Sequence, residues 1–390
     1  MSLSRKIVAA CLAGLTIAAS LVSAGTATAA PRKVVGAYYA SWASGTNPIS
    51  AIPTDTPLTH LFYSFSTIEQ NKCVLNAPSS AKDFADIKAL KQRKPGFKAV
   101  ISIGGWGAAG FSDAALTAQS RKAFVASCVD LFFRGANAGV FDGIDLDWEF
   151  PVSGGPAEIT DRPEDKHNMT LLTKEFRKQL GSGRLVTGAL PTGRLQTDGQ
   201  YDPAASFELG ELARVMDFIN VMTYDMGTGF SSVATFNAPL RAVAEDPLAQ
   251  PGKRWNNVVS AIDFYQLHGV PASKMVLGVP FYGRGFVVKQ DGPNHGLYQG
   301  YDSTFWVDGA ADVQRLKATA GWQEYWHPTA QSPWLYNAAE KRFVSFENSR
   351  SIGIRADFAK RRGLLGTFMW ELSNDDAQHS LLTAMAGPFR

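Results

Sequence analysis

The sequence predicts a parallel (β/α)8 TIM barrel that carries a small α+β insertion between its seventh strand and the helix that follows. Eight short runs of apolar, β-branched and aromatic residues alternate with mostly helical stretches along the 390-residue chain, which is the pattern of such a barrel. The runs are nearly continuously apolar, as parallel strands covered on both faces should be. A segment from about residue 284 to 346 breaks the alternation and is too long for a crossover loop.

The expected strands lie in the runs 33–42, 59–68, 97–106, 141–150, 184–191, 218–225, 275–283 and 364–372. The expected helices cover 81–93, 113–138, 164–180, 207–215, 254–269, 351–363 and 377–387. The first crossover, 43–57, predicts only a weak helix. The interrupting segment is rich in Gly, Trp and Tyr and predicts short antiparallel strands with a helix. The expected division is therefore a barrel over 30–283 and 347–390 and an insertion domain over 284–346.

Residues 1–29 have the pattern of a secretory signal peptide. Arg5 and Lys6 form a basic start, an apolar run follows, and Ala27-Thr28-Ala29 fits the small-x-small cleavage pattern. An uncleaved membrane anchor is the alternative, but the run is short and rich in Ala, Ser and Thr. We therefore expect a secreted, extracellular protein, and no later stretch is long and apolar enough to span a bilayer.

The charge of the chain limits which partners we expect, and its cysteine content limits which disulfides can form. The formal net charge is +3, of which two charges lie in the predicted signal, and no Lys/Arg-rich run marks nucleic-acid binding. We expect a monomer with neither a nucleic-acid nor a membrane partner. In an oxidising compartment Cys73 and Cys128 allow one disulfide, and the alternative is two separate buried thiols.

The fourth strand contains a row of acids in the stretch FDGIDLDWEFP, residues 141–151. Alternate side chains of a strand point to opposite faces, so Asp145, Asp147 and Glu149 share the inward face of the barrel. Glu149 comes last, at the C-terminal mouth where such barrels hold catalytic groups. Three inward carboxylates cannot all ionise cheaply, so at least one keeps a proton. A protonated carboxyl at the mouth is a general acid for a leaving oxygen.

Two other interpretations of these acids, a calcium site and structural ion pairs, are disfavoured. A calcium loop is disfavoured because Asp142, Asp145, Asp147 and Glu149 lack its spacing and its glycine. Structural ion pairs are disfavoured because a row of three acids on one apolar strand is costly for structure alone. Asp142 has the opposite parity, and we assign it a structural role.

The stretch DGIDLDWE resembles the D-x-x-D-x-D-x-E signature of glycoside hydrolase family 18, the chitinases and their relatives. Further motifs follow in family order: SIGGW at 102–106, VMTYD at 221–225, NAPL at 237–240, GVPFYGRGF at 278–286 and FMWEL at 368–372. Jointly they are specific, and the inserted segment resembles that of the chitinase subfamily that carries one. The resemblance covers the chain from about Val34 to its end.

The resemblance implies a retaining, substrate-assisted hydrolysis, in which the sugar's own N-acetyl group supplies the nucleophile. It implies that Glu149 is the general acid. Asp147 would orient the acetamido group and share a proton with Asp145. Tyr224 would donate a hydrogen bond to the acetamido oxygen, and Asp225 would contact the strained sugar. No metal or organic cofactor is needed.

The resemblance also implies a substrate groove with aromatic platforms. Trp370 would lie under the scissile sugar, Trp106 on the leaving-group side, and Arg284 would hydrogen-bond sugar oxygens. The expected substrate-binding residues are Trp106, Trp370, Met222, Tyr38, Phe65, Tyr282 and Arg284. Four more tryptophans could either line the wall of the groove or form the core of the insertion, and both alternatives stay open: Trp306, Trp322, Trp326 and Trp334.

One departure from the family pattern concerns the segment after the sixth strand. Many relatives have a tryptophan there, whereas YDMGTGFSS places Phe230 and then Ser231 at about that position.

We expect a secreted chitinase that cleaves β-1,4 linkages of chitin or N-acetylglucosamine oligomers. The alternatives are an endo-β-N-acetylglucosaminidase acting on N-glycan cores and a catalytically silent chitin-binding lectin. Such lectins typically lose the acid, and Glu149 is present here.

Overall fold

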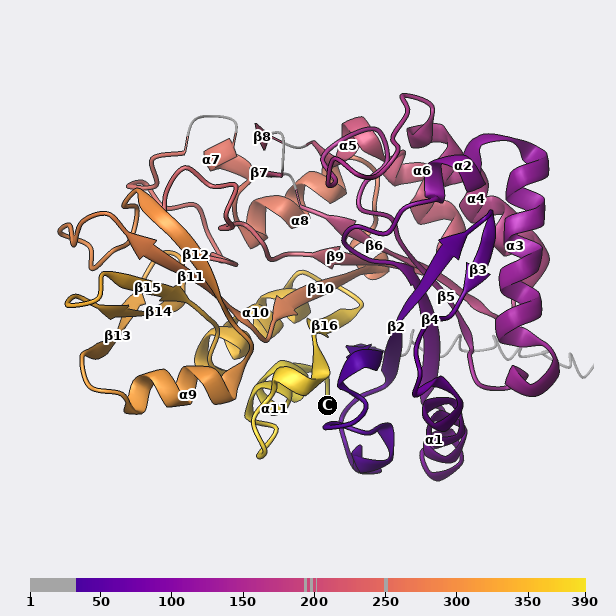
Figure 1. Cartoon of the computed structure of the whole chain (residues 1–390), viewed down its shortest axis with the longest axis horizontal. Coiled ribbons are helices and arrows are strands. Elements are labelled where there is room, and N and C mark those ends of the chain that lie inside the picture. The colour runs from indigo at the N-terminus through magenta and orange to yellow at the C-terminus, as the bar shows by residue number, and fades with distance from the viewer. Residues whose placement is uncertain (1–32, 193–194, 197–198, 201, 249–251) are drawn as a thin grey trace, which may run out of the picture. The chain divides into compact units, whose positions relative to one another are not determined.

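The computed structural model describes residues 33–192, 195–196, 199–200, 202–248 and 252–390. The predicted signal peptide, 1–29, lies outside the described residues. A parallel barrel forms the larger part of the described chain (Figure 1). Its eight strands are β1 (Val34–Ala40), β2 (His60–Glu69), β4 (Lys98–Gly104), β5 (Gly143–Asp147), β6 (Leu185–Pro191), β9 (Phe218–Met222), β10 (Met275–Pro280) and β16 (Gly366–Trp370). The barrel closes because β1 pairs in parallel with both β2 and β16.

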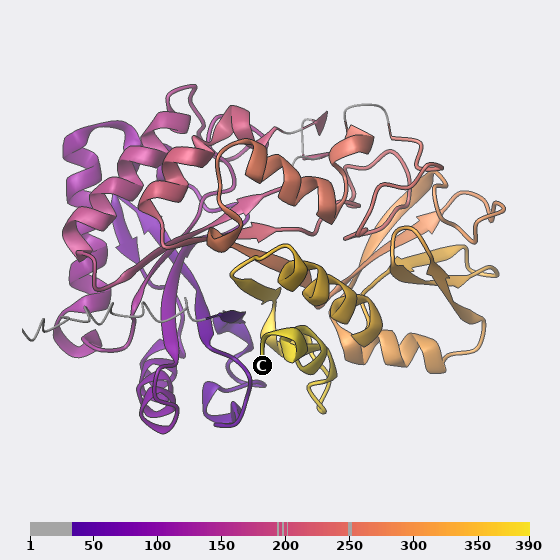
Figure 2. The same ribbon diagram turned by 180° about the vertical axis from the view of Figure 1, so that it is seen from behind.

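Helices cover the outside of the barrel, as Figure 2 shows from behind. They are α1 (Ser80–Arg93), α2 (Phe111–Leu116), α3 (Ala118–Phe133), α4 (Asp165–Leu180), α5 (Pro203–Ser206), α6 (Leu209–Val215), α7 (Gly252–Trp255), α8 (Val258–Leu267), α10 (Ser349–Arg361) and α11 (Ser380–Ala386). Outward side chains of the strands form one continuous apolar core with them. Among the described residues, no helix has the length and apolar character needed to cross a membrane.

Two local expectations were wrong, and three short strands were missed. The weak helix predicted for 43–57 is only two 3-10 turns, Ser41–Ala43 and Ile49–Ala51. The single helix predicted for 113–138 is two helices, because Thr117 takes an extended conformation and forms a capping box with Ser120 at the start of α3. Strand β3 (Lys72–Val74), antiparallel to the end of β2, and the small pair β7 (Leu195–Gln196) and β8 (Gly199–Gln200) were not predicted.

The insertion lies between β10 and α10, as predicted from the sequence. It contains the antiparallel strands β11 (Gly283–Val288), β12 (Tyr301–Val307), β13 (Trp322–His327), β14 (Ser332–Asn337) and β15 (Arg342–Ser345), and helix α9 (Ala310–Ala318). Figure 1 shows these strands grouped together in orange, beside the barrel. Two apolar clusters of its own hold the insertion together. Trp322 and Trp334 belong to these clusters, so the open question of their role is answered in favour of core packing.

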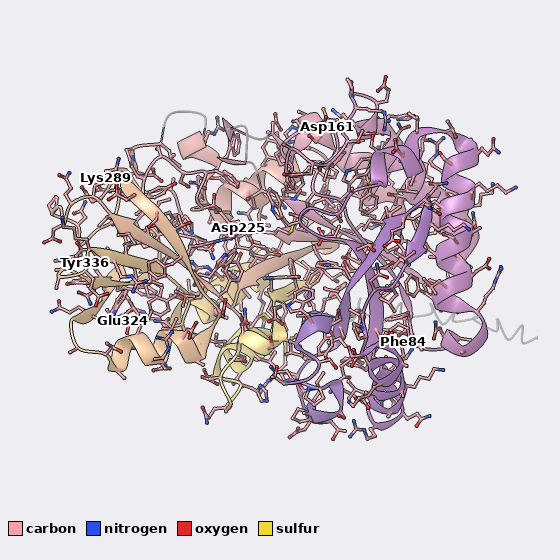
Figure 3. The ribbon with its side chains drawn as sticks, in the orientation of Figure 1. Phe84, Asp161, Asp225, Lys289, Glu324 and Tyr336 are labelled. Carbon is pink, nitrogen blue, oxygen red and sulfur yellow. A yellow bond between two sulfur atoms is a disulfide. The ribbon has the colours of Figure 1, made fainter. Side chains whose placement is uncertain are left out.

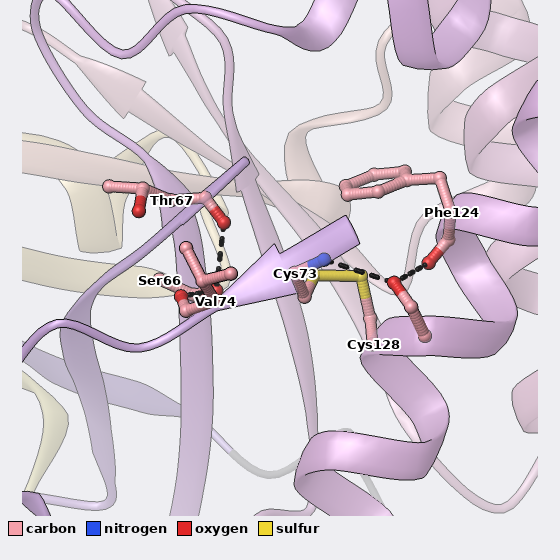
Figure 4. The surroundings of a disulfide bond; sticks show 7 residues. Ser66, Thr67, Cys73, Val74, Phe124 and Cys128 are labelled. Carbon is pink, nitrogen blue, oxygen red and sulfur yellow. Dashed lines mark hydrogen bonds between the residues drawn. A yellow bond between two sulfur atoms is a disulfide. The ribbon is translucent and has the colours of Figure 1, made fainter. Parts of the chain in front are cut away.

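A disulfide joins Cys73 of β3 to Cys128 of α3, with the two Cα atoms 5.0 Å apart (Figure 4). The bridge that the cysteine count allowed is therefore confirmed, and the alternative of two free thiols is excluded. The backbone N–H of Cys73 also donates to Ser127 Oγ at 3.0 Å. Strand β3 is thus held to α3 by a covalent bond and a hydrogen bond.

Candidate active site

A pocket of about 650 Å³ opens where the C-terminal ends of the barrel strands meet the insertion. Its walls come from both parts: Asp147, Glu149 and Trp370 follow barrel strands, whereas Phe286 and Trp306 belong to the insertion. Figure 3 shows Asp225, another lining residue, where the two parts meet. The C-terminal mouth is where barrels of this class hold their chemistry.

The inward row of acids on β5 begins with Asp145, which is fully buried. Its carboxylate accepts hydrogen bonds from Tyr38 Oη (2.8 Å), Ser102 Oγ (2.9 Å) and Thr187 Oγ1 (2.6 Å). Burial raises the pKa of Asp145, whereas these donors act to lower it. Ser102 and Thr187 come from the strands that flank β5, in register with Asp145, whereas Tyr38 reaches it across the barrel from β1. Asp145 is therefore held below the pocket rather than in its wall.

Asp147 lies one step higher and does line the pocket. The neighbouring backbone must pass close by: a Cβ on Gly104, whose φ is +119°, would lie 2.0 Å from the Asp147 carbonyl oxygen. Burial, together with the Glu149 and Asp145 carboxylates, raises the pKa of Asp147 well above its usual value. Its buried Oδ1 has no hydrogen-bond partner within the described part of the chain. The raised pKa means that this carboxyl, like that of Glu149, holds a proton more readily than an ordinary aspartate.

Glu149 follows the last residue of β5 and is half-buried in the pocket wall. Burial, and secondly the negative charge of Asp225, raises the pKa of Glu149 to about 8. The carboxyl therefore keeps its proton at neutral pH, the state that a general acid needs. The even-numbered residues point the other way, as predicted: Trp148 stacks on Phe111 of α2 with ring centroids 5.2 Å apart. Asp142 forms salt bridges with Lys91 and Lys98, at 2.8 and 3.5 Å, which is a structural role.

A second polar group forms where β9 ends. Asp225 has a positive φ of 56°, and its backbone N–H donates to Asn237 Oδ1 at 2.8 Å. The Asp225 carboxylate accepts hydrogen bonds from Tyr282 Oη (2.6 Å) and from Arg284 Nε (3.0 Å). Burial raises the pKa of Tyr224 well above its usual value, so its phenol remains a proton donor. Tyr224 packs closely on β10 because Gly278 has no side chain: a Cβ there would lie 2.8 Å from the ring.

The aromatic side chains of the pocket form two contact groups. Phe65 stacks on Trp370, and Trp42 contacts both rings, with centroid distances of 5.7, 6.2 and 6.3 Å. In the other group, Trp106 lies 6.4 Å from Phe230. Trp42, Trp106 and Phe230 remain 67%, 50% and 47% exposed. Exposed flat rings around a polar centre suit the apolar faces of sugar rings.

The pocket gathers the residues that the sequence singled out. Lining it are Glu149, Asp147, Tyr224, Asp225, Trp106, Trp370, Met222, Tyr38, Phe65, Tyr282 and Arg284. Asp145 does not line it and contacts it through Tyr38. Trp306, whose role the sequence left open, lies in the pocket wall and is 65% exposed. The Arg284 guanidinium lies 4.2 Å from the centre of the Trp306 ring.

Sequence reasoning missed Trp42, which lies in the pocket wall. The available signal was its place at the end of the first apolar run, four residues after Tyr38. Trp326 is placed outside the pocket wall, with the Arg350 guanidinium 3.8 Å from its ring centre. Among the described residues, no group of three or more His, Cys, Asp or Glu side chains is arranged to hold a metal ion.

A closed parallel barrel with a carboxyl of raised pKa at its mouth and aromatic rings around it is the arrangement expected of a glycoside hydrolase. The chain belongs to the glycosyl hydrolases family 18, whose model matches residues 34–375. It is 36% identical to chitinase A1 of Niallia circulans, with 88% of this chain and 56% of that protein covered. The chain thus spans little more than half the length of that relative.

Two solved structures support the same fold. Chitinase ChiW from Paenibacillus sp. str. FPU-7 is 32% identical, with a TM-score of 0.81, covering 92% of this chain and 43% of that chain. A glycoside hydrolase family 18 N-acetylglucosaminidase from Paenibacillus barengoltzii is 27% identical, with a TM-score of 0.78, covering 92% of this chain and all of the other. The predicted barrel and family are therefore confirmed.

Proposed function

We propose that the protein hydrolyses β-1,4 linkages between N-acetylglucosamine units of chitin or its oligomers, with Glu149 as the general acid. The observation that carries the proposal is the acidic row of β5, in which burial and Asp225 raise the pKa of Glu149 to about 8. The similarity to a chitinase and to an N-acetylglucosaminidase supports this substrate. No particular contact favours an N-glycan or a purely lectin function.

The first step forms one bond and breaks another. Glu149 donates its proton to the glycosidic oxygen while the carbonyl oxygen of the substrate's N-acetyl group attacks the anomeric carbon. The glycosidic bond breaks, the shortened chain leaves as an alcohol, and a cyclic oxazolinium intermediate remains. The Glu149 carboxylate then takes a proton from water, whose oxygen adds to the anomeric carbon and reopens the ring. Two inversions at one carbon give net retention.

The neighbouring side chains suit the charge that develops. As the amide oxygen attacks, its nitrogen becomes positive, and the carboxylate of Asp147, which lines the pocket, would accept a hydrogen bond from that N–H. Tyr224 would donate to the acetamido oxygen and align it. Asp145, fixed by Tyr38, Ser102 and Thr187, would exchange a proton with Asp147 during the cycle. Asp225, held by Tyr282 and Arg284, would bind the strained sugar.

The remaining assignments concern organisation and export. We assign 1–29 to a secretory signal, 30–283 with 347–390 to the catalytic barrel and 284–346 to the insertion domain, and we expect a secreted monomer. The substrate-binding roles of Trp106, Trp370, Phe65 and Met222 belong to the same proposal, since rings along the pocket would carry sugar faces. Trp42 joins them through its contacts with Phe65 and Trp370.

The variant Glu149→Gln tests the proposal. We expect turnover of the N-acetylglucosamine hexamer to fall by at least about 10²-fold, because loss of a general acid costs that much. Binding should survive, because Gln resembles the protonated Glu that prevails at neutral pH. Hydrolysis is followed by product chromatography and binding by tryptophan fluorescence.

Glu158→Gln is the matched control, since Glu158 is an exposed residue of the loop that follows the same strand. It should retain both activity and binding. If Glu149→Gln loses binding and turnover equally, Glu149 is structural and the proposal fails.

A further inference from the structure

The turn that carries Phe230 is closed by its own hydrogen bonds. The backbone N–H of Ser231 donates to the Thr228 carbonyl at 3.0 Å, and the N–H of Thr228 donates to Ser231 Oγ at 3.0 Å. The N–H of Phe230 donates to Thr228 Oγ1 at 3.2 Å. The turn is therefore a compact unit that presents one half-exposed ring toward Trp106, 6.4 Å away.

This turn is held by Tyr301, the first residue of β12 in the insertion. The Tyr301 hydroxyl lies 2.7 Å from the carbonyl oxygens of both Gly229 and Ser231. It has one hydrogen, so it donates to one carbonyl at a time or is shared between them. Its ring packs against Phe286 with centroids 4.9 Å apart, and Phe286 is buried in the apolar cluster of the insertion. The hydroxyl therefore reaches the turn from a fixed base.

The chain that follows the turn is also bound to the insertion. The N–H of Ala234 donates to the Gln299 carbonyl, and the N–H of Tyr298 donates to the Ala234 carbonyl, both at 2.8 Å. Ala234 and Phe236 are buried within the same apolar cluster as Phe286. Residues 228–236 thus follow β9 of the barrel and contact residues of the insertion. Their position at the pocket is set by the insertion as well as by the strand that precedes them.

We propose that Tyr301 is a positioning residue that fixes Phe230 beside Trp106 and thereby sets how the pocket grips the sugars of the leaving group. The inference rests on the proposed function and deepens it. Tyr301 does not line the pocket, so it acts through Phe230. Removing its hydroxyl leaves two carbonyl oxygens of the turn without this donor, while the ring and its contact with Phe286 are kept. Phe230 then loses its fixed orientation, whereas the acidic row of β5 is untouched.

The test compares Tyr301→Phe with the wild-type protein on two substrates. N-acetylglucosamine hexamer needs sugars bound on the leaving-group side, whereas 4-nitrophenyl N,N′-diacetylchitobioside offers only one small ring there. We expect KM for the hexamer to rise roughly threefold to tenfold with little change in kcat, as loss of about one hydrogen bond would give. The hexamer products should shift in length, and kcat/KM for the nitrophenyl substrate should change less than about twofold.

Tyr325→Phe is the matched control. Tyr325 also lies on the insertion sheet and donates its hydroxyl to Gln323 Oε1 at 2.6 Å, outside the pocket wall. It should behave like the wild type on both substrates. Thermal unfolding of each variant shows whether the fold is preserved.

The outcomes separate the two proposals. Unchanged hexamer kinetics and products in Tyr301→Phe would overturn the role of Tyr301 while leaving the proposed function intact. An equal loss on both substrates would overturn it as well, because a general structural defect affects both. A wild-type protein that cleaves neither substrate would overturn the proposed function and this inference together.

Discussion

Neighbouring acids on one strand have different environments in this pocket. Asp145 has donors from four other strands, whereas Asp147 has a buried oxygen with no partner in the described structure. Glu149 faces the charge of Asp225, which, after burial, raises its pKa to about 8. Environment rather than residue type thus distinguishes the three carboxyl groups.

The raised pKa of Glu149 predicts a pH dependence. The acid acts when protonated, so kcat/KM should be sustained below the pKa of Glu149 and fall as pH rises through about 8. Asp225→Asn removes a negative charge that raises this pKa, so the alkaline limb should move to lower pH. Initial rates on the hexamer across the pH range measure both limbs.

An alkaline limb that stays in place in Asp225→Asn would show that Asp225 does not tune Glu149. A wild-type limb near 4.5, the ordinary value for a glutamate, would show that the acid is not shifted at all.

Strand parity and position alone placed Asp147 and Glu149 inward at the mouth, whereas the other predicted lining residues, such as Tyr224 and Trp370, rested on the family resemblance. Trp42 was missed because it follows its strand, in a 3-10 turn where alternation no longer applies. The hydrogen bonds of Asp225 were also not predicted, since Tyr282 and Arg284 come from a distant segment of the chain.

Among the elements, β3 and α3 are connected by the disulfide that Figure 4 shows. The bridge closes a loop with a sequence separation of 55 residues, so it restricts the unfolded chain strongly. Cys73→Ala with Cys128→Ala should lower the free energy of unfolding by about 2–4 kcal/mol. Urea unfolding followed by fluorescence measures the change.

Reductant provides the control for this prediction. It should destabilise the wild-type protein and leave the double variant unaffected. A wild-type protein that is equally stable with and without reductant would contradict a stabilising bridge.

Elements were predicted where periodicity is strong and missed where side-chain hydrogen bonds decide. The eight barrel runs are apolar and clear. The break between α2 and α3 depends on a capping box in which Ser120 replaces the usual Glu or Gln, so the sequence signal was weak. Strand β3 has only three residues and is fixed by its pairing with β2.

For the described molecule as a whole, the insertion is joined to the barrel by more than its two connections. Ala234 and Phe236, which follow β9, are buried in an apolar cluster of the insertion. Arg355 of α10 is fully buried and donates to the Gln331 carbonyl at 3.1 Å and to Ser332 Oγ at 2.8 Å, both in the insertion. The sequence predicted the insertion from its length and composition. It did not predict these contacts, because they join residues far apart in the chain.

The central claim is that hydrolysis proceeds with retention through the substrate's own acetamido group. The most direct measurement is a time course on N-acetylglucosamine hexamer that records the anomer of each new reducing end, with Glu149→Gln as the inactive control. We expect the β-anomer to appear first and then to equilibrate slowly with the α-anomer. Early release of the α-anomer would mean a single displacement by water, and would contradict the roles proposed for Asp147 and Glu149.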